Sequence, residues 1–141
     1  MSDAPDLVIR RTLPVPRERV FDAWLDPRML ARFMRPGDMP ESTVELDPRV
    51  GGAFKITMNH GGPDGVHWGK YLVIDRPSRL VFTWISAHTD QDETLVTVEF
   101  REQGKGTELV LTHSRLPNAK RNMHDEGWTE ILNALGRAIA G

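Results

Sequence analysis

Histidines are the residues of this sequence with the widest chemical range. An imidazole that titrates near neutral pH can act as a general acid, a general base or a metal ligand. There are five: His60, His67, His88, His113 and His124. No two of them have the i, i+4 spacing of a helical zinc site or the i, i+2 spacing of a strand site, and no H-E-x-x-H motif occurs. We therefore expect no metal site and no cofactor.

Nucleophilic catalysis has no recognisable residue set either. The chain contains no cysteine, which excludes a thiol nucleophile, a disulfide framework and a cysteine-based zinc site. Ser86 and Ser114 lack the G-x-S-x-G elbow. Ser114 directly follows His113, so on a strand the two side chains point to opposite faces. We assign no catalytic residue.

Binding is the role that the histidine positions favour. His60 and His113 fall on the inward face of predicted strands, where an imidazole either meets a ligand as a polar anchor or is a satisfied core residue. His124 lies four residues before Trp128 and shares its helical stripe. His67 lies near a glycine-rich hairpin and His88 near a strand end, so we expect both to be exposed to solvent.

Aromatic and methionine side chains could line an apolar cavity or form an ordinary core, because binding pockets are mostly apolar with a few placed polar groups. Gly127 lies within a predicted helix, at a cost of about 1 kcal/mol relative to alanine. A close helix–sheet approach or an open space beneath the helix would explain it. The candidate set is Trp24, Phe33, Met34, Phe54, Met58, Trp68, Tyr71, Phe82, Trp84, Met123 and Trp128.

The composition of the chain indicates the class of protein to which these residues belong. The 141 residues are 39% hydrophobic and 27% charged, which predicts a single globular domain over residues 1–141 with a frayed tail at residues 1–6. A formal charge of −2 argues against a nucleic-acid partner. No apolar run suits a membrane helix and the N-terminus does not resemble a signal peptide, so we expect no membrane insertion and a cytoplasmic location.

The N-terminal part predicts one strand followed by two short helices. Residues 7–13 are β-like and end at Pro14 and Pro16. An apolar helical stripe, residues 20–25, ends at Asp26-Pro27, and Asp26 can cap a second helix. Pro36-Gly37 ends that second helix.

From residue 43 to residue 113 the hydrophobic period is 2, which indicates antiparallel strands with one buried face. Clusters of glycine and proline separate the runs. The residues expected on the inward face are Phe54, Ile56, Met58, His60, Leu80, Phe82, Trp84, Ser86, Val96, Val98, Phe100, Leu109, Leu111 and His113.

The last segment, residues 118–140, returns to helical periodicity, and Asn118 can cap its start after Pro117. A sheet with one apolar face must cover that face. The C-terminal helix is the only element long enough, so we expect an α+β fold in which a curved antiparallel sheet of about six to seven strands wraps around it.

This layout resembles the helix-grip fold of the START-like (SRPBCC) superfamily, to which the major birch-pollen allergen belongs. The stretch from Gly69 to Trp84, GKYLVIDRPSRLVFTW, is similar to that of small bacterial proteins related to the activator of Hsp90 ATPase. Further similar segments are RTLPVPRERVFDAWLDPRMLARFM, the turn at residues 49–52, THSRLP and EGWTEILNAL. The resemblance implies a deep cavity between sheet and helix that holds apolar or amphipathic small molecules.

Three functions follow as hypotheses. The first is binding of an apolar or aromatic small molecule. The alternatives are a cyclase- or hydrolase-type enzyme that uses His60 or His113 as general acid or base, and a domain that interacts with the chaperone Hsp90, which the missing second domain of the eukaryotic cochaperone disfavours. An exposed sheet edge could also form a homodimer. The ligand-binding candidates are His60, Trp84, His113, Trp128, Phe54, Met58, Tyr71, Met123 and His124.

Overall fold

The computed structural model describes residues 6–35, 37, 39–58 and 65–140. The candidate His60, nearly all of the glycine-rich hairpin at residues 61–65 and residues 1–5 of the expected tail lie outside the described residues.

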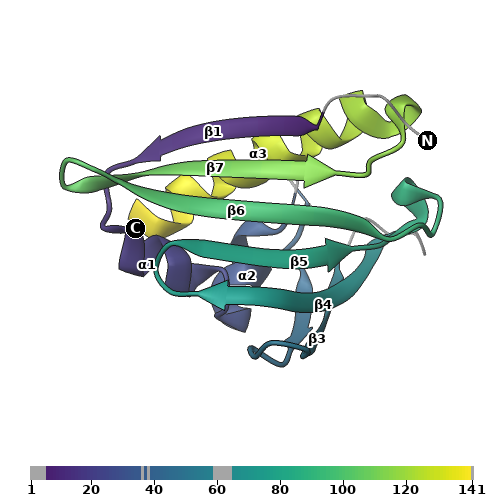
Figure 1. Ribbon diagram of the computed structural model, residues 1–141, viewed down its shortest axis with the longest axis horizontal. Coiled ribbons are helices and arrows are strands. Elements are labelled where there is room, and N and C mark those ends of the chain that lie inside the picture. Colours follow the sequence, from purple (N-terminus) through teal and green to yellow (C-terminus); the bar gives the residue numbers. More distant parts are fainter. Residues whose placement is uncertain (1–5, 36, 38, 59–64, 141) are drawn as a thin grey trace.

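The described strands form one antiparallel sheet of seven, in the order β1-β7-β6-β5-β4-β3-β2. The order confirms the predicted curved sheet, with β1 returning to pair with the last strand (Figure 1). The strands are β1 (Leu7–Leu13), β2 (Thr43–Leu46), β3 (Ala53–Thr57), β4 (Val66–Asp75), β5 (Arg79–Trp84), β6 (Thr94–Gln103) and β7 (Gly106–Ser114).

Two short helices follow β1, as predicted: α1 (Arg17–Ala23) and α2 (Pro27–Phe33). The Asp26 carboxylate accepts a hydrogen bond from the Arg28 backbone N–H at 2.9 Å, which is the expected N-cap of α2.

The start of the C-terminal helix differs from the expectation. Asn118 makes no side-chain cap; it begins a short 3-10 turn, η3 (Asn118–Lys120), and the long helix α3 covers Arg121–Ala140. Because Pro117 at the start of η3 already fixes the backbone geometry, the helix begins without a side-chain acceptor.

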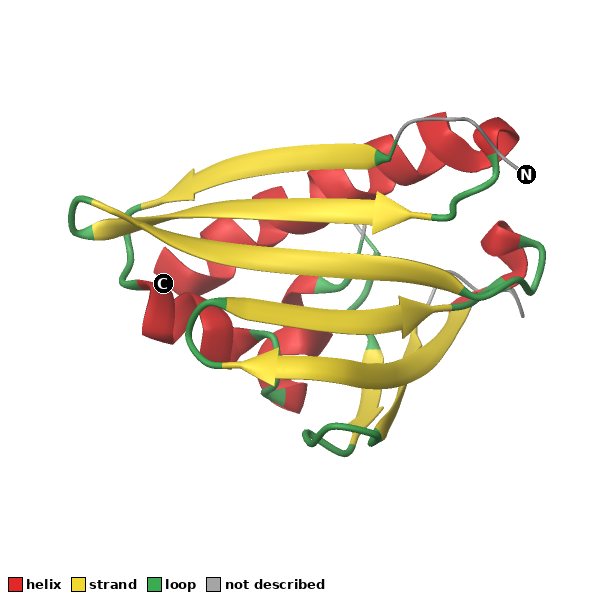
Figure 2. Ribbon diagram, viewed as in Figure 1, coloured by secondary structure: helices red, strands yellow, loops and turns green. Residues whose placement is uncertain are grey.

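Helix α3 crosses one face of the sheet and buries its apolar stripe there (Figure 2). All the described residues predicted on the inward face are buried, including Phe100, Leu109 and His113. The N-terminal end of α3 lies at the same end of the molecule as the 3-10 turn η2 (Ala87–Thr89), whereas α1 lies at the opposite end (Figure 1).

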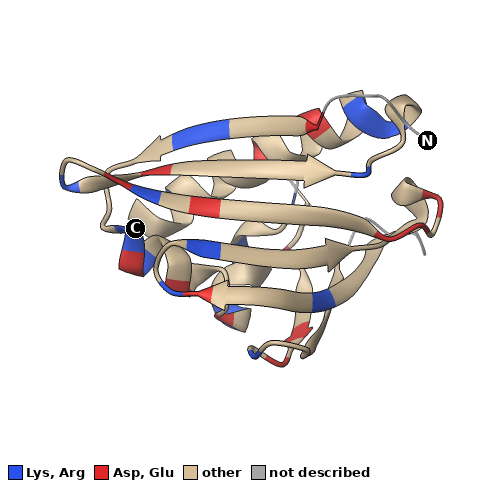
Figure 3. Cartoon of the chain, viewed as in Figure 1, with Lys and Arg blue, Asp and Glu red and all other residues tan. Residues whose placement is uncertain are grey.

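The opposite face of the sheet carries the charged side chains of the strands. Acidic and basic residues alternate along β6, and the charged positions of the neighbouring strands do not gather into one patch (Figure 3). Arg101 lies there between Glu99, at 3.5 Å, and Glu108, at 3.7 Å. Among the described residues, no helix is long and apolar enough to cross a membrane.

Candidate ligand-binding site

A cavity of about 320 Å³ lies between the N-terminal half of α3 and the facing strands. Its volume falls at the lower end of the roughly 300–1,000 Å³ typical of small-molecule sites. The lining is largely apolar, with polar groups concentrated in histidines and two glutamates. It consists of Met39, Met58, His67, Trp84, His88, Met123, His124, Glu126, Gly127, Trp128, Glu130 and Ile131.

Two tryptophans form the aromatic wall of this cavity. The rings of Trp84 on β5 and Trp128 on α3 have centroids 5.0 Å apart, and each residue is only 2% exposed. The His67 ring also packs against Trp84, with a distance of 4.9 Å between the ring centroids. Sheet and helix therefore meet through aromatic contacts, which prefer tilted geometries such as these.

Gly127 leaves open space beside Trp128. A Cβ atom built on Gly127 would meet no atom within 4 Å, apart from its own helix and chain neighbours. Of the two explanations offered for a glycine here, the structure therefore shows the open space and not a close helix–sheet approach. By contrast, a Cβ atom on Gly69 would lie 2.0 Å from the Thr83 carbonyl oxygen, so that glycine serves close strand approach.

A chain of three buried hydrogen bonds links the indole of Trp128 to the backbone of Trp84. The Trp128 indole N–H donates to His113 Nδ1 at 3.0 Å, and His113 Nε2 lies 2.7 Å from Thr94 Oγ1. Because an indole only donates, His113 Nδ1 must accept and Nε2 must carry the proton of the neutral ring. The Thr94 hydroxyl then donates to the Trp84 carbonyl oxygen at 2.5 Å.

This chain fixes both the tautomer and the charge of His113. The side chain is fully buried. Burial, reinforced by the neighbouring His124, lowers the pKa of His113 to about 3, so the ring is neutral at physiological pH. With both ring nitrogens engaged inside the protein, His113 positions Trp128 and has no lone pair to offer a ligand as a general base.

His124 lies one helical turn before Trp128 and faces the cavity directly. Its Nδ1 is 2.8 Å from the Lys120 carbonyl oxygen, so Nδ1 carries the proton. Burial lowers the pKa of His124, and its hydrogen bond to Lys120 opposes that effect. In the neutral ring Nε2 is an acceptor, the chemistry needed to receive a hydrogen bond from a ligand hydroxyl or amine.

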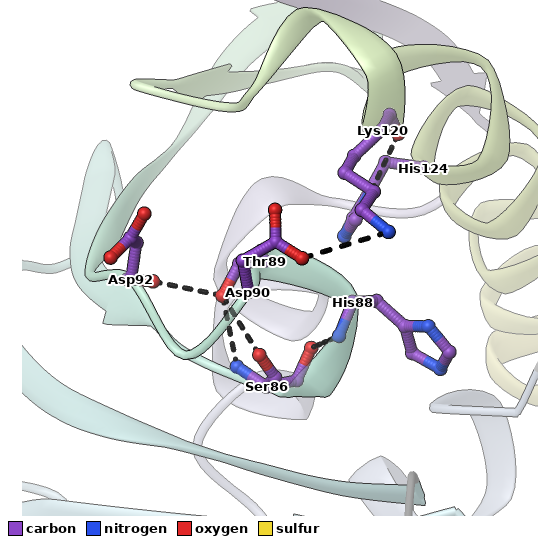
Figure 4. A network of polar contacts seen from close by, with 7 residues as sticks. All are labelled: Ser86, His88, Thr89, Asp90, Asp92, Lys120 and His124. Atoms are coloured by element: carbon purple, nitrogen blue, oxygen red, sulfur yellow. Dashed lines mark hydrogen bonds and ion pairs between the residues drawn. The ribbon is translucent and has the colours of Figure 1, made fainter.

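The turn η2, which carries the cavity-lining residue His88, is stabilised by local hydrogen bonds (Figure 4). A capping box between Ser86 and Thr89 holds this turn, and both residues are fully buried. His88, which lines the cavity, projects away from that cluster (Figure 4). An ion pair of 3.7 Å between Asp90, at the end of η2, and Lys120 of η3 joins the two turns.

The sequence-predicted site residues fall into three groups. Trp84, Met58, Met123, His124 and Trp128 line the cavity. His113 lies one layer behind Trp128, so it is not the lining residue that its inward position suggested.

Phe54 and Tyr71 lie deeper, around an inner hollow of about 10 Å³ that also touches Trp24, Met34 and Phe82. Burial raises the pKa of the Tyr71 hydroxyl. Trp68 points to the outer face and is 36% exposed, so it belongs to none of these three groups.

Two histidines expected in solvent were placed wrongly. His67 is only 6% exposed and His88 is half-buried, and both line the cavity. The signal for His67 was the alternation of β4, in which His67, Gly69 and Tyr71 share the inward face. The neighbouring glycine-rich hairpin obscured it. His88 lies in an irregular turn, where no periodicity reports the side-chain direction.

The polar groups that face the cavity are few, and most of them are imidazoles. No group of three or more His, Asp or Glu residues within the described part of the chain is placed to hold a metal ion. The His67 ring packs against Trp84, and burial lowers the pKa of His124. The cavity therefore presents a largely apolar surface with a small number of hydrogen-bonding groups.

Comparison with known proteins places this fold and cavity in a family. The family model "Activator of Hsp90 ATPase homolog 1-like protein" matches residues 14–140. The chain belongs to this family. The resemblance to START-like proteins and the helix-grip fold are thereby confirmed. No curated protein matches the sequence.

Solved structures agree with this assignment. An Hsp90 activator from Plasmodium falciparum is 26% identical, with a TM-score of 0.80 and 97% of both chains covered. The protein CalU16 from Micromonospora echinospora is also 26% identical, with a TM-score of 0.75, covering 94% of this chain and 74% of that one. A protein from Chromobacterium violaceum, at 24% identity and a TM-score of 0.80, covers 96% of this chain and 97% of its own and shares the fold.

Proposed function

We propose that this family member binds a small, uncharged, largely aromatic molecule between α3 and the sheet. The observation that carries the proposal is the cavity of about 320 Å³ walled by Trp84 and Trp128 and left open by Gly127. Apolar surface removed from water contributes roughly 25 cal/mol per Å², so a flat ring system against two indoles gains most from this shape.

The charges of the lining favour an uncharged ligand over an anionic one. Its carboxylates, Glu126 and Glu130, are on exposed residues of α3, and the described residues of the lining include no lysine or arginine. An anion would therefore enter without a cationic partner. His124 offers an acceptor for one ligand hydroxyl or amine, which would orient the ring system.

The test uses N-phenylnaphthylamine, an uncharged fluorescent aromatic compound, titrated into the purified protein. Gly127→Leu fills the open space and should weaken probe affinity at least tenfold while strengthening the helix. Asn122→Leu is the matched control, because it adds the same side chain at an exposed position of α3 outside the cavity lining. Equal affinity in the two variants would refute the cavity as the binding site.

Interaction with Hsp90 is a second candidate function, supported by family membership and by the likeness to the Plasmodium activator. The test is whether the purified chain stimulates the ATPase of Hsp90 and is retained by it on a column. Stimulation that survives Gly127→Leu would assign the activity to a surface other than the cavity. Absence of both effects would remove this candidate.

A further inference from the structure

A second concave site lies between α2 and α3, away from the aromatic wall. It is a hollow of about 130 Å³ lined by Arg32, Arg35 and Arg137 together with Ala134 and Ala138. The lining residues on α3 begin one turn beyond Ile131, the last α3 residue of the main cavity. Because Ala134 and Ala138 have small side chains, the hollow between the guanidinium groups stays open.

The arginines of this hollow have no acidic partner within the described part of the chain. The ion pairs found there involve Arg49, Arg76, Arg101 and Lys120. Ala134 and Ala138 cannot supply a counter-charge. Three guanidinium groups therefore line one hollow, one on α2, one just after α2 and one on α3, and no described residue supplies an anion to balance them.

Arg35 is held in place by backbone rather than by a carboxylate. Its Nε donates to the Arg32 carbonyl oxygen at 2.9 Å, and its Nη1 donates to the Met39 carbonyl oxygen at 2.7 Å. Two of its five N–H groups are used in this way, which fixes the guanidinium plane and leaves three donors. A guanidinium fixed before binding loses little conformational entropy when an oxyanion arrives.

We infer that the hollow formed by Arg32, Arg35 and Arg137 binds a phosphate group. Guanidinium forks match phosphate oxygens geometrically and are more weakly hydrated than ammonium groups. Three positive charges exceed what a single carboxylate can balance, which favours the doubly charged group. The phosphate is either free in solution or the head group of a phospholipid.

The experiment is calorimetric titration of the purified protein with inorganic phosphate, with potassium chloride at matched ionic strength as the blank. Arg137→Gln should weaken phosphate binding about tenfold or more, because a hydrogen bond to a charged group is lost. Arg101→Gln is the control, since Arg101 lies among glutamates on the outer face of the sheet. It should change binding less than twofold.

Vesicles distinguish the two sources. Sedimentation with phosphatidylcholine vesicles containing phosphatidic acid, compared with phosphatidylcholine alone, detects a head-group interaction that Arg137→Gln should abolish. If titration with phosphate releases or absorbs heat but the protein does not sediment with the vesicles, free phosphate is the ligand. No heat above the chloride blank, or equal heat in wild type and Arg137→Gln, overturns the inference.

Arg32 and Arg137 lie in the last turns of their helices, where a cation also stabilises the helix dipole. Thermal unfolding of Arg137→Gln without phosphate measures that contribution separately. If the variant loses stability but keeps its phosphate affinity, Arg137 only stabilises its helix, and the proposed phosphate site is refuted.

Discussion

At the scale of single residues, His113 organises the cavity without touching its contents. It accepts from Trp128 and faces Thr94, so one imidazole sets the position of the indole that forms the wall. The period-2 pattern of β7 could predict that His113 points inward. Its partners come from β6 and α3, and no spacing along the chain encodes contacts between those elements.

Replacing His113 with leucine should cost roughly 2–4 kcal/mol of unfolding free energy, because the Trp128 indole N–H and the Thr94 hydroxyl each lose a buried partner. Urea unfolding monitored by circular dichroism measures the loss. His113→Asn, which keeps an acceptor and a donor, should recover part of it. A leucine variant as stable as wild type would contradict the structural role assigned to this histidine.

Stability should fall as the pH is lowered through the range in which unfolded histidine titrates. His113 takes up a proton near pH 6.5 when unfolded but only near pH 3 when folded, so between these values the unfolded state binds more protons. Each such histidine contributes up to about 1.4 kcal/mol per pH unit. The lowered pKa of His124 acts in the same direction.

Urea unfolding at several pH values between about 7.5 and about 4.5 tests this linkage. The slope should be shallower in His113→Asn, which cannot titrate. An identical pH dependence in wild type and His113→Asn would show that other groups control acid stability.

At the scale of elements, α3 buries an apolar stripe but has a gap beside it, where Gly127 lacks a side chain. The stripe is predictable from its 3.6-residue period. The gap is not, because Gly127 could equally mark a close contact, and only the surroundings of the missing side chain distinguish the two. The wrong N-cap at Asn118 has a similar origin, since residue preference alone cannot show that Pro117 starts a 3-10 turn.

Gly127→Ala should separate helix stability from ligand binding. Alanine raises helix propensity by up to about 1 kcal/mol, and the added methyl group meets open space. Thermal unfolding should therefore show a more stable protein, whereas probe titration should show a weaker complex. A variant that is destabilised would mean that the space beneath Gly127 is occupied.

At the scale of the whole molecule, the sheet and the three α-helices were predictable from the hydrophobic pattern, because binary patterning determines which faces are buried. The family was predictable from segments of similar sequence, such as Gly69 to Trp84. The site was predictable only in part. Trp84 and Trp128 follow from inward alternation and the helical stripe. His88 and the arginine hollow depend on segments that meet only after folding, so no local pattern reports them.

The charge distribution of the molecule should discriminate between two probes of nearly equal shape. Anilinonaphthalenesulfonate is N-phenylnaphthylamine with a sulfonate group, and the cavity lining supplies carboxylates but no lysine or arginine. The uncharged probe should bind at least tenfold more tightly in parallel fluorescence titrations. Tighter binding of the sulfonate, abolished by Arg137→Gln, would instead place the probe at the arginine hollow.

The hydrogen bond from Trp128 to His113 also gives the cavity its own spectroscopic reporter. Of the four indoles, Trp24 has a buried N–H without a partner, and the Trp68 ring is partly in solvent. Among the described residues, only the Trp128 indole donates to an aromatic nitrogen. Its proton should resonate downfield of the other indole signals and exchange slowly with deuterium oxide, so a seated ligand can be followed through one resolved line without any label on the ligand.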